Sequence, residues 1–162
     1  MLSSVDNLEE RARNILLKLL ERGPKSSSEL ALALEKHEIP TEIAQQVLKR
    51  FAEVQLIDDR QVAEQLAVAS RRTKGLARSM VKKKLADKGL DQQVIDEIAA
   101  SISDEDELLV ATELASKRLG QLSQFDAETQ KRRLVGFLQR RGFSSSVVFE
   151  AIREAQAQAV KS

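Results

Sequence analysis

One pattern that recurs three times constrains the fold of this sequence more than any other feature. In each copy a helical stretch ends near a leucine, a short turn with an apolar residue follows, and the next helical stretch begins at the same offset. The three leucines are Leu34, Leu85 and Leu138, which lie 51 and 53 positions apart. Self-similarity at a fixed period of this size is typical of repeat architectures.

The residues after these leucines indicate how the helices end and restart. Gly89 and Gly142 suit the left-handed backbone conformation that is common just past a helix end. Asp91 and Ser144 suit the N-cap of the next helix, where a side-chain oxygen accepts a hydrogen bond from an exposed backbone N–H. The pattern therefore predicts a helix, a glycine turn and a second helix in the last two copies.

These observations predict an all-α fold of three tandem three-helix repeats that form an elongated, curved array. The repeats are expected at residues 6–56, 57–102 and 103–158. A unit of this size buries little surface alone, so neighbouring repeats must stack. Glu38 and Pro40 replace the glycine and the cap in the first repeat, which makes its turn the weakest match.

Composition agrees with an all-helical chain and excludes several classes of protein. Good helix formers dominate, and six Gly and two Pro among 162 residues are too few for a β-sandwich or barrel. The absence of cysteine excludes disulfides, thiol chemistry and cysteine metal sites. No apolar run approaches the roughly 18 residues that span a bilayer, and the N-terminus lacks a signal-peptide pattern. We therefore expect a cytoplasmic protein without membrane association.

The net charge of +1 conceals three blocks of alternating sign. Residues 71–90 carry eight bases and one acid, residues 91–113 carry eight acids and no base, and residues 117–141 carry seven bases and two acids. Such blocks suggest surfaces for charged partners. They can also be solvated faces, because 31% of this chain is charged.

No catalytic or metal site can be assigned from the sequence. His37 is the only histidine, and neither a nucleophile nor an orienting acid can be paired with it. The acidic run 104–107 lacks the ligand spacing of a calcium loop. That run and Asp58-Asp59 instead fit the starts of helices, where carboxylates oppose the helix dipole. We predict a protein that is not an enzyme, with no catalytic residue, no metal and no cofactor.

The basic residues of the second and third repeats favour a binding surface. In the second helix of the second repeat, Ala77, Val81 and Leu85 form an apolar stripe. Arg78, Lys82 and Lys83 lie clear of this stripe, whereas Lys84 is expected at its edge. Stacked repeats would line one groove suited to an acidic partner or a phosphate backbone. The candidate contact residues are Arg71, Arg72, Lys74, Arg78, Lys82, Lys83, Arg132, Arg133 and Arg140.

Three stretches carry a resemblance to a known family. The segment 56–65, with its paired acid after two apolar residues, resembles the apolar–Asp-Asp segment of the RecX family, bacterial regulators of the recombinase RecA. Lys74-Gly75 followed by Lys88-Gly89-Leu90 resembles the family pattern, and residues 134–144 resemble its Arg-Arg-Gly-Phe turn. The match extends over about Leu8 to Glu154.

The resemblance implies a non-enzymatic modulator. Members of that family bind RecA and RecA–single-stranded DNA filaments in the filament groove and inhibit the ATPase, strand-exchange and coprotease activities. This implies a role in DNA repair, homologous recombination and the SOS response. We expect a monomer whose partners are RecA and its filament, with weak direct binding to DNA.

Other functions stay open from the residues alone. A tandem helix-turn-helix-like protein could bind nucleic acid without RecA, although the chain has no Trp or Tyr to stack on bases and its phenylalanines are expected in the core. A scaffold could bind an unrelated helical partner. A helical hydrolase is disfavoured, because no nucleophile, base or metal set can be named.

Overall fold

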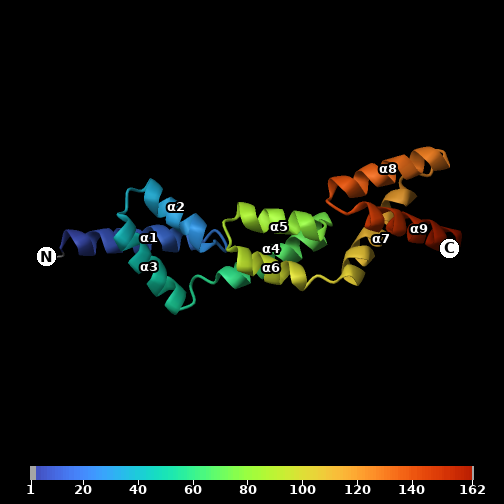
Figure 1. Ribbon diagram of the computed structural model, residues 1–162. Coiled ribbons are helices and arrows are strands. Elements are labelled where there is room, and N and C mark those ends of the chain that lie inside the picture. The colour runs from blue at the N-terminus through green and yellow to red at the C-terminus, as the bar shows by residue number, and fades with distance from the viewer. Residues whose placement is uncertain (1–2, 162) are drawn as a thin grey trace. The chain divides into compact units, whose positions relative to one another are not determined.

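The computed structural model describes residues 3–161, and in this range it contains nine α-helices and no strand (Figure 1). The predicted all-α fold is confirmed. The helices are α1 Ser4–Leu20, α2 Ser27–Lys36, α3 Thr41–Glu53, α4 Asp59–Lys74, α5 Arg78–Asp87, α6 Gln92–Ala100, α7 Asp104–Gly120, α8 Ala127–Arg140 and α9 Ser145–Lys161.

The chain divides into two compact units. The first unit contains the described residues up to Gln65 together with Leu85–Ile95. The second unit contains Leu66–Lys84 and the described residues from Asp96 onward. The division passes through α4, α5 and α6, so each of these helices contributes residues to both units. The repeat boundaries given above stay a prediction.

In the first unit, α1, α2 and α3 pack against one another around an aliphatic core. Leu16, Leu30 and Leu34 are fully buried there, and Phe51 closes the core at the end of α3. Glu38 takes the left-handed conformation with φ of 60°, and Pro40 caps α3 without a side-chain hydrogen bond. The first turn therefore takes the left-handed conformation without a glycine, and α3 begins without a side-chain cap.

In the second unit, α7 packs along α9, and α8 contacts both. Leu134 and Leu138 on α8 are fully buried against Val148 and Ile152 on α9. The spacing of four positions within each pair places its two residues on one helical face, which is the packing that the apolar pattern indicates.

The first unit contains hydrogen bonds between α2 and residues of the second predicted repeat. The Ser27 backbone N–H donates to Asp59 Oδ1 at 2.8 Å, so a carboxylate at the start of α4 caps the start of α2. The Ser28 hydroxyl donates to the Gly89 carbonyl oxygen at 2.7 Å. We call these contacts the first joint. They satisfy an orphan N–H of α2 and a free carbonyl beyond α5.

The second unit contains the same arrangement one repeat later. The Arg78 backbone N–H donates to Glu107 at 2.9 Å to Oε2 and 3.1 Å to Oε1, so a carboxylate of α7 caps the start of α5. The Ser79 hydroxyl donates to the Gly142 carbonyl oxygen at 2.7 Å. These contacts form the second joint. Both joints thus use the same two contacts: a carboxylate that caps a helix start and a serine hydroxyl that donates to a glycine carbonyl oxygen.

A third contact extends the correspondence between the joints. The Ser26 hydroxyl donates to the Lys88 carbonyl oxygen at 2.7 Å, and the Ala77 backbone N–H donates to the Arg141 carbonyl oxygen at 2.9 Å. The donors lie 51 positions apart and the acceptors 53, which are the offsets of the sequence repeat. The repeat therefore encodes the contacts of the two joints as well as the helices.

Glu29 makes the first unit sensitive to acid. Burial acts to raise the pKa of Glu29, but hydrogen bonds from Ser26 and Lys88 outweigh it and lower this pKa below its ordinary value of 4.5. Its carboxylate lies 3.2 Å from Lys88 Nζ. A depressed folded-state pKa contributes stability that is present above the unfolded-state value and is lost as pH falls through the folded-state value.

Glu29→Gln is therefore expected to lower the unfolding temperature at neutral pH and to have a vanishing effect in acid. Gln keeps the N3 hydrogen bond of a capping box, so the comparison isolates the charge. Unfolding temperatures of both proteins from about pH 7 to about pH 3 would check it. A difference between the proteins that is constant with pH would contradict the assignment.

Candidate functional site

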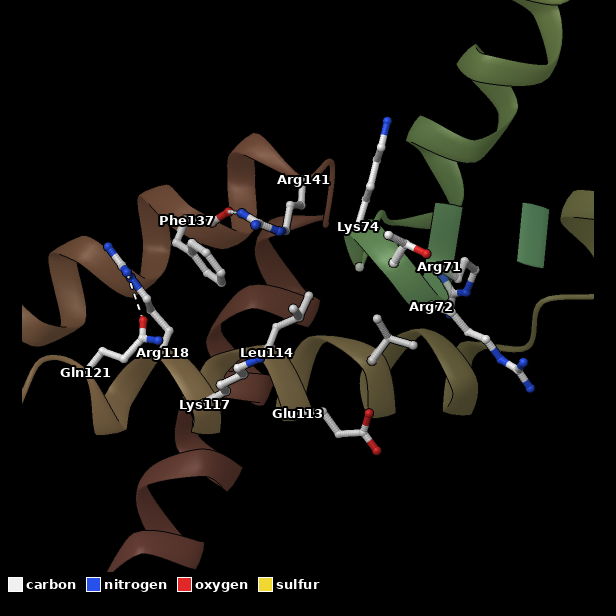
Figure 2. A pocket seen from close by; sticks show the side chains of 13 residues that line it. Arg71, Arg72, Lys74, Glu113, Leu114, Lys117, Arg118, Gln121, Phe137 and Arg141 are labelled. Atoms are coloured by element: carbon white, nitrogen blue, oxygen red, sulfur yellow. Dashed lines mark hydrogen bonds between the residues drawn. The ribbon is translucent and has the colours of Figure 1, made fainter. Parts of the chain in front are cut away.

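A cavity of about 610 Å³ in the second unit gathers basic side chains from three helices (Figure 2). The end of α4, the middle of α7 and the end of α8 form its walls. Glu113 is the one carboxylate among the described residues that line it. The cations that line it are Arg71, Arg72, Lys74, Lys117, Arg118 and Arg141.

The walls are fixed by backbone features near Gly75. This glycine has φ of 60°, and a Cβ built on it would lie 2.8 Å from both terminal methyl carbons of Leu114. The end of α4 therefore lies directly against α7. On the opposite wall, the Arg141 carbonyl oxygen is held by the Ala77 N–H of the second joint.

One of the six cations is neutralised within the protein. Arg71 Nη1 lies 2.6 Å from Glu107 Oε1, and both side chains are largely buried. The same guanidinium donates to the carbonyl oxygens of Leu76 and Asp106, at 3.2 and 3.3 Å. Arg71 therefore connects the end of α4 to the start of α7, and its charge is compensated there.

Arg118 and Arg141 surround Phe137, and their charge is not compensated in the same way. Their guanidinium carbons lie 5.4 and 3.9 Å from the Phe137 ring centroid, and Figure 2 shows them on either side of this residue. Arg118 Nη1 donates to Gln121 Oε1 at 2.9 Å. The Nε atoms of both arginines are buried without a hydrogen-bond partner among the described residues.

Burial lowers the pKa of Arg141, and the like charges of Arg140 and Arg118 lower it further. The lowered pKa of Arg141 thus reflects mainly the partial desolvation of its guanidinium, with like-charge repulsion as a smaller contribution. In Figure 2 the Glu113 side chain extends away from Phe137, so it does not relieve the repulsion between Arg118 and Arg141.

The structure brings three of the predicted contact residues together and commits a fourth elsewhere. Arg71, Arg72 and Lys74 all line the cavity. Arg78 Nη2 pairs with Asp104 Oδ1 at 2.9 Å, and its Nη1 donates to the Ile102 carbonyl oxygen at 2.7 Å. Its guanidinium thus ties the start of α5 to the segment that leads into α7.

The other five predicted residues are exposed and lie outside this cavity. Lys82 and Lys83 lie on α5, while Arg132, Arg133 and Arg140 lie on α8. The Arg133 guanidinium stacks 4.1 Å from the Phe125 ring centroid. A groove shared by the two helices stays a prediction.

Sequence reasoning missed Lys117, Arg118 and Arg141 as members of one site. The basic block 117–141 contains all three, but a charge count does not show which of its members approach α4. The expectation that the phenylalanines are core residues is wrong for Phe149, which is 45% exposed. Phe137 is half-buried and serves as a platform for two guanidinium groups.

The single histidine lies at the end of α2, and the acidic run 104–107 forms the first turn of α7. His37 is exposed at the end of α2. Within the acidic run, Asp104 pairs with Arg78 and Glu107 with Arg71. Among residues 3–161, no group of three or more His, Cys, Asp or Glu side chains could hold a metal ion. No helix in the same range is both long and apolar enough to cross a membrane.

The fold and the cavity define a tandem helical-repeat protein with uncompensated basic surface. Family models match two parts of it: the RecX first three-helix domain over residues 12–51 and the RecX third three-helix domain over residues 104–152. The regulatory protein RecX of Thermobifida fusca is 35% identical over 149 residues, which cover 92% of this chain and 80% of that protein. The chain belongs to the RecX family of regulatory proteins.

Further relatives agree with this assignment. The regulatory protein RecX of Streptomyces coelicolor is 36% identical over 146 residues, covering 90% of this chain and 78% of that protein. The crystal structure of RecX from Lactobacillus salivarius has the same fold, with a TM-score of 0.83 at 18% identity over 93% of this chain and 98% of that one. A second RecX crystal structure has a TM-score of 0.76 at 23% identity, covering 93% of this chain and 74% of that chain.

Proposed function

We propose that this protein binds RecA filaments on single-stranded DNA, in the filament groove, and inhibits their recombinase, ATPase and coprotease activities. Membership of the RecX family of regulatory proteins supports a regulatory role. The observation that carries the proposal further is the set of exposed bases on α5 and α8.

Exposed bases suit a reversible contact with a filament. Lys82, Lys83, Arg132 and Arg140 are exposed, so little desolvation accompanies their approach to a carboxylate or a phosphate. Charges of one sign also steer association and make it depend on ionic strength. A protein that contacts several filament subunits through such residues would hinder the subunit rearrangements that hydrolysis and strand exchange require.

The ion pairs within the protein show which candidate residues can be changed without disturbing the fold. Arg71 and Arg78 hold Glu107 and Asp104, so replacing either would disturb the fold together with any contact. Lys82, Lys83, Arg132 and Arg133 have no such ion pair among the contacts described for this chain. These four residues are therefore the ones to change in a test of function.

Reversing these four residues to Glu is expected to weaken inhibition of RecA by about tenfold or more in apparent affinity. The assay is the single-stranded-DNA-dependent ATPase of RecA, titrated with this protein at two salt concentrations. Inhibition by the unaltered protein should weaken as salt rises, and inhibition by the variant should depend less on salt.

A matched control carries the same change of net charge on the first repeat. Arg22, Lys36, Lys49 and Arg50 are exposed bases of that repeat, and their reversal should leave inhibition within about twofold of the unaltered protein. Equal losses of inhibition in both variants would show that the effect depends only on net charge. Unchanged inhibition by the α5 and α8 variant would refute the assigned surface.

The alternative function is direct binding of nucleic acid without RecA, and the basic cavity favours it. The comparison that separates the two functions is affinity for bare single-stranded DNA against affinity for RecA-coated DNA, at one salt concentration. We expect RecA-coated DNA to be preferred. Equal affinity would favour the alternative, because phosphate contacts alone supply sequence-independent binding.

A further inference from the structure

The cavity between α4, α7 and α8 contains more positive charge than its own residues neutralise. Arg71 is paired with Glu107, which leaves five further cations and a single carboxylate among the described lining residues. That carboxylate belongs to Glu113, which extends away from the Phe137 end of the cavity (Figure 2).

The strongest evidence for a bound anion comes from two arginines at the Phe137 end of the cavity. The Nε atoms of Arg118 and Arg141 are buried without a hydrogen-bond partner in the described part of the chain. A buried N–H without an acceptor is costly, and two nearby like charges add repulsion in a partly desolvated site. A bound anion that accepts hydrogen bonds from their Nη groups would remove the repulsion between the two charges.

We propose that this cavity binds a phosphate group, with Arg118 and Arg141 as its main ligands and Lys74 and Lys117 as additional cations. A guanidinium presents donors in a fork that matches phosphate geometry, and the excess of several positive charges suits a multiply charged anion better than one carboxylate. The inference goes beyond the proposed function, because it requires neither RecA nor its filament.

The size and rigidity of the cavity fit this ligand. Pockets for small molecules span about 300–1,000 Å³, and the cavity measures about 610 Å³. The contact of Gly75 with Leu114 and the second joint at Arg141 fix its walls before a ligand arrives. A preorganised site loses less affinity to ordering than a flexible one.

The phosphate has two chemical sources: a free phosphate or polyphosphate, and the backbone of single-stranded DNA. Phe137 is already covered by guanidinium groups, so base stacking on this ring does not contribute to the recognition. The shared ligand is thus the phosphate group, and the experiment must separate the two sources.

The experiment is binding and thermal unfolding of the full chain without RecA. The probes are inorganic pyrophosphate, an oligothymidylate and a polyglutamate peptide, with sodium chloride at matched ionic strength as the reference. Pyrophosphate or the oligothymidylate should raise the unfolding temperature in a saturable manner. Pyrophosphate binding identifies a free phosphate ligand, and binding of the oligothymidylate alone identifies the DNA backbone.

The double variant R118Q/R141Q should bind the effective probe at least tenfold more weakly. K74Q/K117Q, which leaves both buried guanidinium groups in place, should lose part of the affinity. K36Q/K49Q removes equal charge from exposed positions outside the cavity and should bind as the unaltered protein does. Circular dichroism of each variant establishes that it is folded.

Binding that is unchanged in both cavity variants would overturn the proposal, and so would a stabilisation that chloride reproduces. Polyglutamate binding tighter than that of both phosphate probes would overturn it in favour of an acidic peptide. None of these results bears on inhibition of RecA, so failure here leaves the α5 and α8 surface to be judged by its own assay.

Discussion

Glu107→Ala is expected to lower the free energy of unfolding by about 3–5 kcal/mol, the usual effect of leaving one partner of a buried ion pair alone. Glu107 is 6% exposed and accepts from Arg71 Nη1 and from the Arg78 backbone N–H. Its removal leaves a largely buried guanidinium without its carboxylate, and the first turn of α5 without a cap.

The measurement is denaturant unfolding of the full chain beside the control Glu105→Ala. Glu105 is an exposed acid in the same turn of α7, so its loss removes helix-dipole stabilisation of about 1 kcal/mol or less. Similar losses in the two variants would show that Glu107 acts only as helix-start charge and would refute the cross-helix cap.

A second variant tests whether the cost arises from the unpaired arginine. Adding Arg71→Met to Glu107→Ala removes the stranded charge and keeps an unbranched side chain in its place. The double variant should then be more stable than Glu107→Ala alone, since a coupled pair is not additive. If the double variant loses as much free energy of unfolding as Glu107→Ala and Arg71→Met lose together, the cost does not arise from the ion pair.

The helical repeat could be predicted from the sequence because its signals are local. Apolar spacing predicts the helices, and the glycines after Leu85 and Leu138 predict the left-handed turns that the structure shows at Gly89 and Gly142. The acid at Asp58 also behaves as expected, because its carboxylate accepts from the Gln61 N–H in the first turn of α4, the helix that follows it.

The joints could not be predicted because their partners lie far apart in the chain. Asp59 stands beside Asp58 in the sequence, yet it caps α2, whose Ser27 lies 32 positions away. Glu107 was expected to serve the start of α7 and instead caps α5. A local pattern shows that a carboxylate can cap a helix, but only the packing of helices decides which helix receives it.

The candidate site shows the same limit. The sequence places Arg71, Arg72 and Lys74 at the end of one helix, and the cavity contains all three. Arg118 and Arg141 join them because α7 and α8 approach this end in space. Charge counting therefore located part of the basic surface, whereas the unpaired guanidinium groups depend on tertiary burial that no local signal encodes.

Gly142→Ala is expected to lower the free energy of unfolding by about 2–5 kcal/mol, combining left-handed backbone strain with overpacking. Gly142 has φ of 94°, and a Cβ there would lie 2.4 Å from Met80 Cγ and 2.7 Å from Ser79 Oγ. The hydroxyl of Ser79 also donates to the Gly142 carbonyl oxygen, so any shift that relieves the clash breaks the second joint.

Two further substitutions separate strain from clash in the same denaturant assay. Gly120→Ala adds a methyl group at the last residue of α7 with no neighbour within 4 Å, so it should be neutral or stabilising by up to about 1 kcal/mol. Adding Met80→Ala to Gly142→Ala should recover part of the overpacking cost, because the nearest atom is gone while the Ser79 contact and φ are unchanged. If Gly142→Ala were as harmless as Gly120→Ala, the close approach of α5 to the turn after α8 would not exist in solution, and the second joint would lose its physical basis.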